Sequence, residues 1–379
     1  MTAGIELRFY RLMQMSSAIE DGGWAEFLAK LTAHIDLVAT ARETKAFIRA
    51  RGVPDAASLL RLAMAYGVGG YSLRSTVAWA SMAGVAELSD VSLLGRLRQS
   101  APWLEFLWQH MLGAQVAPVI MPGLGLAVRL IDATTISSPR CPTSEWRLHM
   151  EYCPLEGRFG SAVLTDGRTS EGFHLFEARP GELLVGDRGY AKAGGLAKIR
   201  SADGHFLVRM GWRSLALLDA EGNNFNMLQT IAGLPPGQIS TFDVQIAESN
   251  KRRHPVCSAR LIFAPLPDGA GQRARARAEH RAKRNRRGIL PEGAEAANWL
   301  ILLTSVPRET AEPQHLMALY RLRWQIELAF KRLKSLLQID EILAKDKDLA
   351  RSWLSANLLA ALLADDIDMA SDSSPCAAC

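Results

Sequence analysis

Three carboxylates stand out because each is attached to a segment that could hold it in place. Asp132 follows the apolar run LAVRLI, Asp187 follows GELLVG, and Glu327 lies in the amphipathic stretch YRLRWQIELAFKRLK. Mg²⁺ and Mn²⁺ prefer carboxylate oxygens, so three converging carboxylates with no cysteine or histidine nearby suit two such ions. Such a pair can activate a water or a 3′-hydroxyl for in-line attack on phosphorus. The chemistry that these residues predict is phosphodiester cleavage and transfer.

Glu327 shares its stretch with three other polar residues at helical spacing. Relative to Tyr320, the residues Arg323, Glu327 and Lys334 stand at offsets of three, seven and fourteen. At about 100° per residue the four side chains fall within an arc of about 60°. Apolar residues fill the adjoining arc, as on a helix that faces a core. We therefore predict one continuous helix over 320–334. The alternative for its polar face is a solvated surface with an Arg323–Glu327 ion pair.

The segments that would position the carboxylates predict an α/β protein. Short apolar runs at 126–134, 146–152, 161–167, 181–187, 205–212 and 298–306 are typical of strands. Asp132 and Asp187 are each expected at a strand end, where ligands gather in open α/β sheets. An aspartate there can instead cap the following helix, and for Asp132 taken alone that is the better reading.

Residues 1–115 show helical spacing at 24–50, 56–66, 73–84 and 89–112. Ser89 is a good N-cap for the last of these helices. A short glycine-containing turn before it resembles a helix-turn-helix, and DNA reading and plain packing stay equally open.

The basic charge of the chain is concentrated in one region. The 379 residues carry a net charge of +5, but 251–287 alone has an excess of ten positive charges, which leaves the remainder acidic. This density favours a polyanion partner over a merely solvated surface. The densest part is expected to be a loop in a β-rich insertion over 213–298. Its candidate DNA contacts are Arg281, Lys283, Arg284, Arg286 and Arg287.

Several other classes of protein are disfavoured. The first residues mix charged and apolar positions, unlike a signal peptide, and the longest uncharged stretch contains prolines and glycines, unlike a membrane span. We expect a cytoplasmic protein. Five cysteines without a repeated CxxC pair support neither a disulfide framework nor a zinc site. The terminal CAAC has the outline of a prenylation box but lacks a polybasic segment before it.

The motifs together resemble a known family. Tyr320-x2-Arg323-x3-Glu327-x6-Lys334 is similar to the Tyr-Arg-Glu-Lys signature of one branch of the DDE transposases, which are encoded by bacterial cut-and-paste insertion sequences. The contexts IDATT around Asp132 and DRGY, which begins at Asp187, also match that family in order. The resemblance extends from about residue 45 to about residue 360.

The resemblance implies a ribonuclease-H-like catalytic core with a β-rich insertion and an N-terminal helical domain. Its domains would be 1–115 (helical, possibly DNA-binding), 116–212 and 299–364 (core), 213–298 (insertion) and 365–379 (a disordered or truncated tail). Asp132, Asp187 and Glu327 would hold two Mg²⁺ or Mn²⁺ ions.

The resemblance also implies DNA contacts. Tyr320, Arg323 and Lys334 would contact phosphates near the cleaved end. Trp299 matches a position that stacks on a flipped base during hairpin formation, with a core tryptophan as an equal alternative. Arg209 would be directed at DNA, with a surface strand arginine as an almost equal alternative.

The expected partners are double-stranded DNA, both transposon ends and target, and a second copy of the chain in the DNA complex; no membrane is expected. Two other functions stay open. One is a metal-dependent nuclease of the same fold without strand transfer. The other is a truncated, non-catalytic DNA-binding inhibitor of transposition, because the chain ends in a short polar tail.

Overall fold

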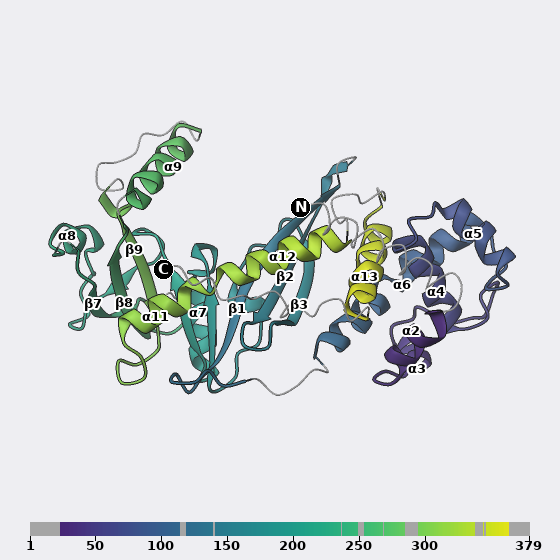
Figure 1. Ribbon diagram of the computed structural model, residues 1–379, viewed down its shortest axis with the longest axis horizontal. Coiled ribbons are helices and arrows are strands. Elements are labelled where there is room, and N and C mark those ends of the chain that lie inside the picture. The colour runs from purple at the N-terminus through teal and green to yellow at the C-terminus, as the bar shows by residue number, and fades with distance from the viewer. Residues whose placement is uncertain are drawn as a thin grey trace, which may run out of the picture.

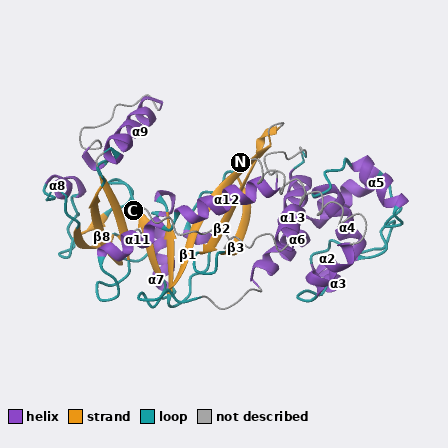
Figure 2. Ribbon diagram, viewed as in Figure 1, coloured by secondary structure: helices purple, strands orange, loops and turns teal. Residues whose placement is uncertain are grey.

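A large mixed sheet forms the centre of the molecule (Figures 1 and 2). The structure is a computed structural model that describes residues 23–113, 119–138, 141–235, 237–248, 254–267, 269–284, 295–337, 344 and 346–363. Over these residues the strand order is β3-β2-β1-β4-β5-β9-β8-β7-β6. The strands are β1 (Ala127–Ser138), β2 (Cys141–Cys153), β3 (Arg158–Asp166), β4 (Glu182–Gly186), β5 (His205–Arg209), β6 (Leu217–Leu218), β7 (Ser240–Ile246), β8 (Cys257–Pro265) and β9 (Trp299–Thr304).

The middle strands β1, β4 and β5 run parallel, and the strands on both sides of them pair antiparallel. Both faces of these middle strands are buried, so their sequences read as continuous apolar runs. Leu130 and Val185 belong to a first apolar cluster on one face, whereas Ile131 and Leu184 belong to a second cluster on the other. The period-two alternation of a strand thus divides neighbouring residues between two cores.

Helices cover the two faces. α11 (Pro313–Arg321) and α12 (Trp324–Leu337) bury Leu316, Ile326 and Phe330 in the first cluster. α7 (Ala193–Ser201) and the short helix η1 (Phe173–Leu175) pack in the second cluster. A second short helix, η2 (Arg188–Tyr190), follows β4 directly. This mixed α/β architecture is consistent with a ribonuclease-H-like core.

The N-terminal part is helical between residues 23 and 113. Its helices are α2 (Gly23–Thr32), α3 (Leu37–Glu43), α4 (Ala56–Gly67), α5 (Leu73–Met82) and α6 (Asp90–Gly113). Ser89 caps α6 as expected, because its Oγ accepts from the Ser92 amide at 3.2 Å. The connection between α5 and α6 spans 83–89, longer than the three- or four-residue turn of a helix-turn-helix, so the predicted short turn is wrong.

The C-terminal helix α13 (Lys347–Leu363) packs into this N-terminal group (Figure 1). Ser352 on α13 donates to the Leu97 carbonyl of α6. Gly67 of α4 lies so close that a Cβ there would stand 2.8 Å from the Ala356 methyl group. Residues from both ends of the chain therefore share one core.

Two expectations about the insertion are modified by the structure. The strands β6, β7 and β8 extend the central sheet through β9, and α8 (Met227–Ala232) follows β6. The basic stretch is not a loop over its described part but the helix α9 (Ala270–Arg284), which projects from the end of the molecule (Figure 1). Alternating alanine and arginine, both good helix formers, explain this. The domain boundaries themselves stay a prediction, and residues 365–379 lie outside the described part.

Candidate active site

The sheet register brings the two aspartates together. β1 and β4 pair in parallel up to Leu130 and Val185, and two residues further along each chain come Asp132 and Asp187. Paired residues of parallel strands point to the same face, so both aspartates continue the side of the sheet on which Leu130 and Val185 lie. That side is the one covered by α12.

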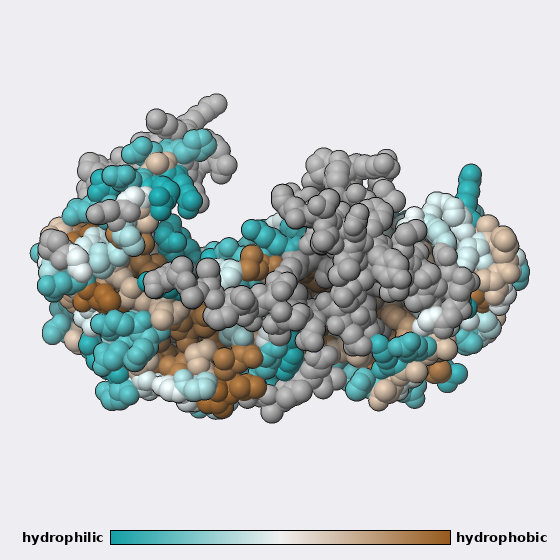
Figure 3. Space-filling model, in the orientation of Figure 1, coloured by the Kyte–Doolittle hydropathy of each residue, from teal (hydrophilic) through white to brown (hydrophobic). Residues whose placement is uncertain are grey.

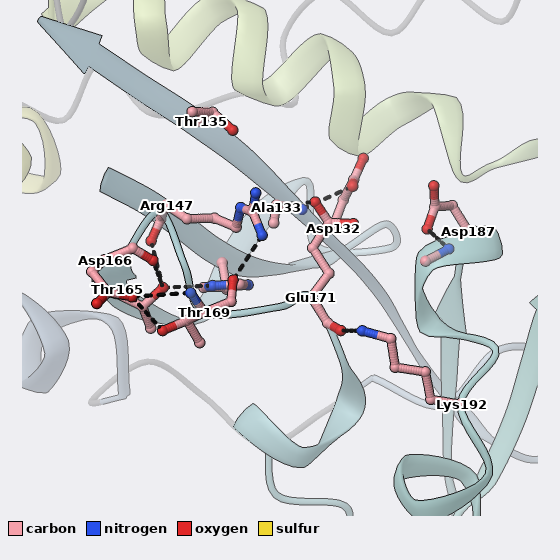
Figure 4. Close-up of polar contacts among 12 residues, drawn as sticks. Asp132, Ala133, Thr135, Arg147, Thr165, Asp166, Thr169, Glu171, Asp187 and Lys192 are labelled. Carbon is pink, nitrogen blue, oxygen red and sulfur yellow. Dashed lines mark hydrogen bonds and ion pairs between the residues drawn. The ribbon is translucent and has the colours of Figure 1, made fainter. Parts of the chain in front are cut away.

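Asp132 does not end its strand, contrary to expectation. β1 continues to Ser138 because β2 pairs with it as far as Ser138, well beyond the point where β4 stops. Asp187 does follow the last residue of β4, as predicted. There it caps η2, since its Oδ1 accepts from the Gly189 amide at 2.7 Å (Figure 4).

Glu327 reaches the aspartates from α12, which Ile326 and Phe330 anchor in the first cluster. Arg323 links the carboxylates: its Nη2 lies 2.6 Å from Glu327 Oε1, and its Nη1 lies 3.5 Å from Asp132 Oδ2. The ion pair with Glu327 is therefore part of a bridge to the sheet, and the Arg323 side chain is only 20 % exposed. The ion pair of the alternative reading is therefore present, and the Glu327 side chain is 51 % exposed, but Arg323 also contacts the sheet through Asp132.

The predicted continuous helix over 320–334 is wrong in one respect. α11 ends at Arg321 and α12 begins at Trp324, with Leu322 and Arg323 in a tight turn between them. The amides of Leu322 and Arg323 donate to carbonyls three residues back, which winds the chain more tightly than an α-helix. Tyr320 and Glu327 therefore stand on different helices, on either side of Arg323.

The electrostatics of the site reflect this proximity. Burial raises the pKa of Asp132 to about 7, the negative charges of Asp187 and Glu327 also raise it, and the Ala133 amide and Arg323 oppose them. Burial likewise raises the pKa of the Tyr320 phenol, with Arg323 and Arg209 opposing. Asp132 thus lies within electrostatic reach of the other two predicted acids and of Arg323.

The donor set fits hard divalent cations. The acids supply only oxygen ligands, and the Arg323 guanidinium already lies as a cation between Asp132 and Glu327. In addition, the hydroxyl of Tyr190 is buried beside the site without a hydrogen-bond partner. Within the described ranges, however, no three His, Cys, Asp or Glu side chains are grouped closely enough to hold an ion.

The other predicted DNA contacts lie in several places. Lys334 Nζ donates to the Thr135 carbonyl of β1 at 2.9 Å, so it faces the sheet. Arg209 ends β5, and the half-buried Trp299 begins β9, which runs antiparallel to β5. Both therefore lie at the end of the sheet where β4 leads into Asp187. This position is compatible with Trp299 stacking on a flipped base. It is equally compatible with a core tryptophan, since Trp299 packs against the second cluster.

The basic residues are only partly described. Arg281, Lys283 and Arg284 belong to α9, without a description of their side chains, and Arg286 and Arg287 lie outside the described residues. Arg273 and Arg277 on the same helix are exposed, and Arg275 Nε donates to the Asn298 side chain at 2.8 Å. Figure 3 shows a largely hydrophilic surface where α9 projects.

One residue near the acids escaped the sequence analysis. Glu171 lies in the loop between β3 and η1, and its side chain extends toward Asp132 in Figure 4. No strand end, helical spacing or motif marks it. The glycine of DRGY is the one signal that could have found it, because the Glu171 carboxylate fills the space that a side chain at Gly189 would need.

Comparison with known proteins assigns the family. Residues 124–363 match the family described as "Transposase DDE domain", so the chain belongs to the DDE transposases of insertion sequences. The protein InsL of insertion sequence element IS186A from Escherichia coli (strain K12) is 41 % identical over 346 residues, which covers 91 % of this chain and 93 % of that protein.

Two further relatives are named as transposases. The transposase for insertion sequence element IS421 from Escherichia coli is 41 % identical over 347 residues, with 91 % of this chain and 93 % of the relative covered. The transposase for insertion sequence element IS231F from Bacillus thuringiensis subsp. israelensis is 22 % identical over 267 residues, with 62 % and 55 % covered. Within the described residues, no helix combines the length and apolar character needed to cross a membrane.

Proposed function

We propose that this protein binds the inverted repeats at the ends of its own insertion sequence, cleaves the DNA there and joins the freed 3′-hydroxyl to target DNA. It would belong to the branch with the Tyr-Arg-Glu-Lys signature. The proposal is supported by the positions of Asp132 on β1 and Asp187 directly after the neighbouring β4, together with Arg323, which contacts both Asp132 and Glu327.

In this proposal Asp132, Asp187 and Glu327 hold two Mg²⁺ or Mn²⁺ ions, which would activate the attacking oxygen and stabilise the leaving oxygen. The protein residues would bind and orient the DNA. Arg323 bridges two of the acids, so it is placed to exchange a carboxylate for a nearby phosphate. Tyr320 and Lys334 would contact the same stretch of backbone, and a second copy of the chain would hold the other end.

The direct test is incubation with Mn²⁺ and a duplex that carries the element's own terminal repeat. We expect nicks at the repeat boundary that leave a 3′-hydroxyl, followed by joining to a second duplex. Cleavage without joining, and without preference for the repeat, would favour the nuclease. Specific binding without cleavage would favour the inhibitor.

The exposed arginines of α9 are expected to contribute non-specific affinity. Replacing Arg273 and Arg277 with glutamine, alone or together with Arg281, Lys283 and Arg284, should weaken binding to repeat and random DNA alike. The slope of log K against log salt should shrink by about 0.9 for each phosphate that the variant no longer neutralises. Arg179→Gln is a matched control, since Arg179 is also exposed but precedes β4 at the opposite end of the sheet. An unchanged slope in the α9 variants would show that α9 is a solvated helix that does not contact DNA phosphates.

Trp299 allows stacking to be separated from packing. If its indole holds an extruded base, Trp299→Ala should leave first-strand nicking nearly intact. It should slow a later hairpin step, because the activation free energy of that step would rise by about 1–3 kcal/mol. Trp299→Phe should recover part of the rate. If Trp299 instead supports the core, alanine should cost about 3–5 kcal/mol of folding stability and depress every step together. Melting curves beside single-turnover rates for each step decide between these outcomes.

A further inference from the structure

A polar pocket lies on the outer part of the sheet. It has a volume of about 340 Å³, and residues of β7, β8, the end of β9 and the loop 305–308 line it. In the strand order β5 and β9 stand between β8 and β4, so this pocket is separate from the candidate active site at Asp187. Of the described residues that line it, Arg260 and Arg308 are cationic and Asp243 is the one carboxylate. The lining therefore carries an excess of one positive charge.

The strand register places Arg260 in the middle of a polar row. Arg260 on β8 pairs with Asp243 on β7 and with Thr304 on β9, so the three side chains follow one another across three strands. Ile262, two positions further along β8, belongs to the first apolar cluster. Since side chains two positions apart share a face, the polar row continues the face of the sheet that α11 and α12 cover.

Arg260 is a buried cation without a counter-charge in contact. Its side chain belongs to a residue that is only 4 % exposed. Its Nη2 donates to the Ala311 carbonyl at 2.7 Å, and its Nε has no hydrogen-bond partner among the described residues. No carboxylate of the described residues forms an ion pair with it. One hydrogen bond to a neutral carbonyl does not offset the cost of taking a guanidinium out of water.

The carboxylate in the pocket is already used by the other arginine. Asp243 Oδ2 lies 3.1 Å from Arg308 Nη2, and Arg308 Nη1 donates to the Thr241 hydroxyl at 3.0 Å. The Arg308 side chain is 48 % exposed, so it stands at the rim of the pocket. Asp243 therefore balances Arg308, and the unbalanced charge of the pocket is that of Arg260.

The pKa of Arg260 reflects the same imbalance. Burial lowers this pKa below its ordinary value, and the positive charge of Arg308 lowers it further. Asp243, Glu312 and Glu309 oppose these effects. Glu309 and Glu312 are exposed, so water and salt screen their repulsion of an incoming anion.

We propose that this pocket binds a phosphate group, with Arg260 as the inner contact and Arg308 as the contact at the rim. Two guanidinium groups can hold a tetrahedral oxyanion from two sides, and Ser258, which also lines the pocket, offers a hydroxyl. The phosphate comes either from a DNA backbone or from phosphate free in solution. The inference does not depend on the metal site or on DNA cleavage.

The test measures phosphate binding directly. Inorganic phosphate is titrated calorimetrically, at constant ionic strength, into the full-length protein in four forms: unaltered, Arg260→Gln, Arg308→Gln and Arg179→Gln. Arg179 is the matched control, because it is an exposed arginine that does not line the pocket. We expect Arg260→Gln to weaken phosphate binding about tenfold or more, Arg308→Gln to weaken it less, and Arg179→Gln to change nothing.

A second variant keeps the test informative if Arg260→Gln does not fold. Arg260→Lys retains the charge and loses the planar fork, so it should keep part of the phosphate affinity. Phosphate should also raise the melting temperature of the unaltered protein more than that of either Arg260 variant. Equal phosphate affinity in the unaltered protein and in the Arg260 and Arg308 variants would overturn the proposal, and so would a lack of phosphate binding by the unaltered protein.

DNA binding distinguishes the two sources of the phosphate. If a DNA backbone supplies it, Arg260→Lys and Arg308→Gln should weaken duplex binding, and inorganic phosphate should compete with the duplex. For Arg308→Gln the slope of log K against log salt should then shrink by about 0.9. If the pocket takes free phosphate, both variants should lose phosphate affinity while duplex binding stays as in the unaltered protein. Cleavage of the element's own end is measured separately, so a failure of the proposed function would not be mistaken for a failure of this site.

Discussion

Replacing Asp132, Asp187 or Glu327 with alanine is expected to abolish Mg²⁺-dependent cleavage of the transposon end while most of the end binding remains. Each change removes a carboxylate that would hold a cation, not a group that would hold DNA. Loss of one stabiliser of developing charge costs on the order of 10²–10³-fold in rate, and loss of a metal ligand should reach at least that range. Single-turnover cleavage and gel-shift affinity, measured on the same preparations, check the two halves of the expectation.

The contact of Arg323 with the acids refines this expectation. Alanine at Asp132 or Glu327 removes one of its two partners, so the guanidinium becomes more available to phosphate and end binding should be kept or strengthened. Glu221→Ala is a suitable control, because Glu221 is an exposed carboxylate far along the sheet, after β6. Substantial cleavage by any one of the three variants would remove that residue from the site.

Replacing Arg129 with methionine is expected to destabilise the fold strongly, because it removes the positive charge from a buried ion cluster in the central sheet. Arg129 is buried in β1, where its guanidinium contacts Glu151 and lies 2.5 Å from Glu182. Without it, two carboxylates remain buried and unpaired, a defect that typically costs about 3–5 kcal/mol. Urea unfolding of the two proteins measures the loss.

An exposed ion pair provides the contrast. Arg308 pairs with Asp243 at 3.1 Å, but their side chains are 48 % and 69 % exposed. Arg308→Gln should therefore cost less than about 1 kcal/mol. If Arg129→Met and Arg308→Gln lowered the free energy of unfolding by similar amounts, the buried contacts of Arg129 with Glu151 and Glu182 would not have the stabilising role expected here. Partial recovery in the triple variant Arg129→Met/Glu151→Gln/Glu182→Gln would support the assignment to unpaired charge.

Apolar runs and turn residues were enough to predict most of the sheet. The run before Asp187 predicted β4 and its end correctly, because a strand buried on both faces leaves a continuous apolar signature. The end of β1 was not predictable in the same way. Asp132 interrupts the apolar run, but pairing with β2, the next strand along the chain, carries the strand six residues further.

The candidate site was predictable where a residue had regular spacing and not where a loop determined its place. Glu327 was found through its helical context, although the spacing could not reveal the tight turn at Leu322 and Arg323, since such a turn needs no special residue. Glu171 had no such context. Its position follows from contacts of Arg147 and Lys192 with its loop, which only the folded sheet brings together.

The packing of α13 against α4 and α6 has a consequence for the timing of synthesis. Gly67 and Ala356, which touch in the folded protein, are separated by 289 residues of chain. At about 5–20 residues per second, a ribosome needs roughly 15 to 60 s to add that length. During this interval the N-terminal helices lack the apolar partner that completes their core. A newly made chain would thus complete the core of its N-terminal helices only after α13 has been synthesised.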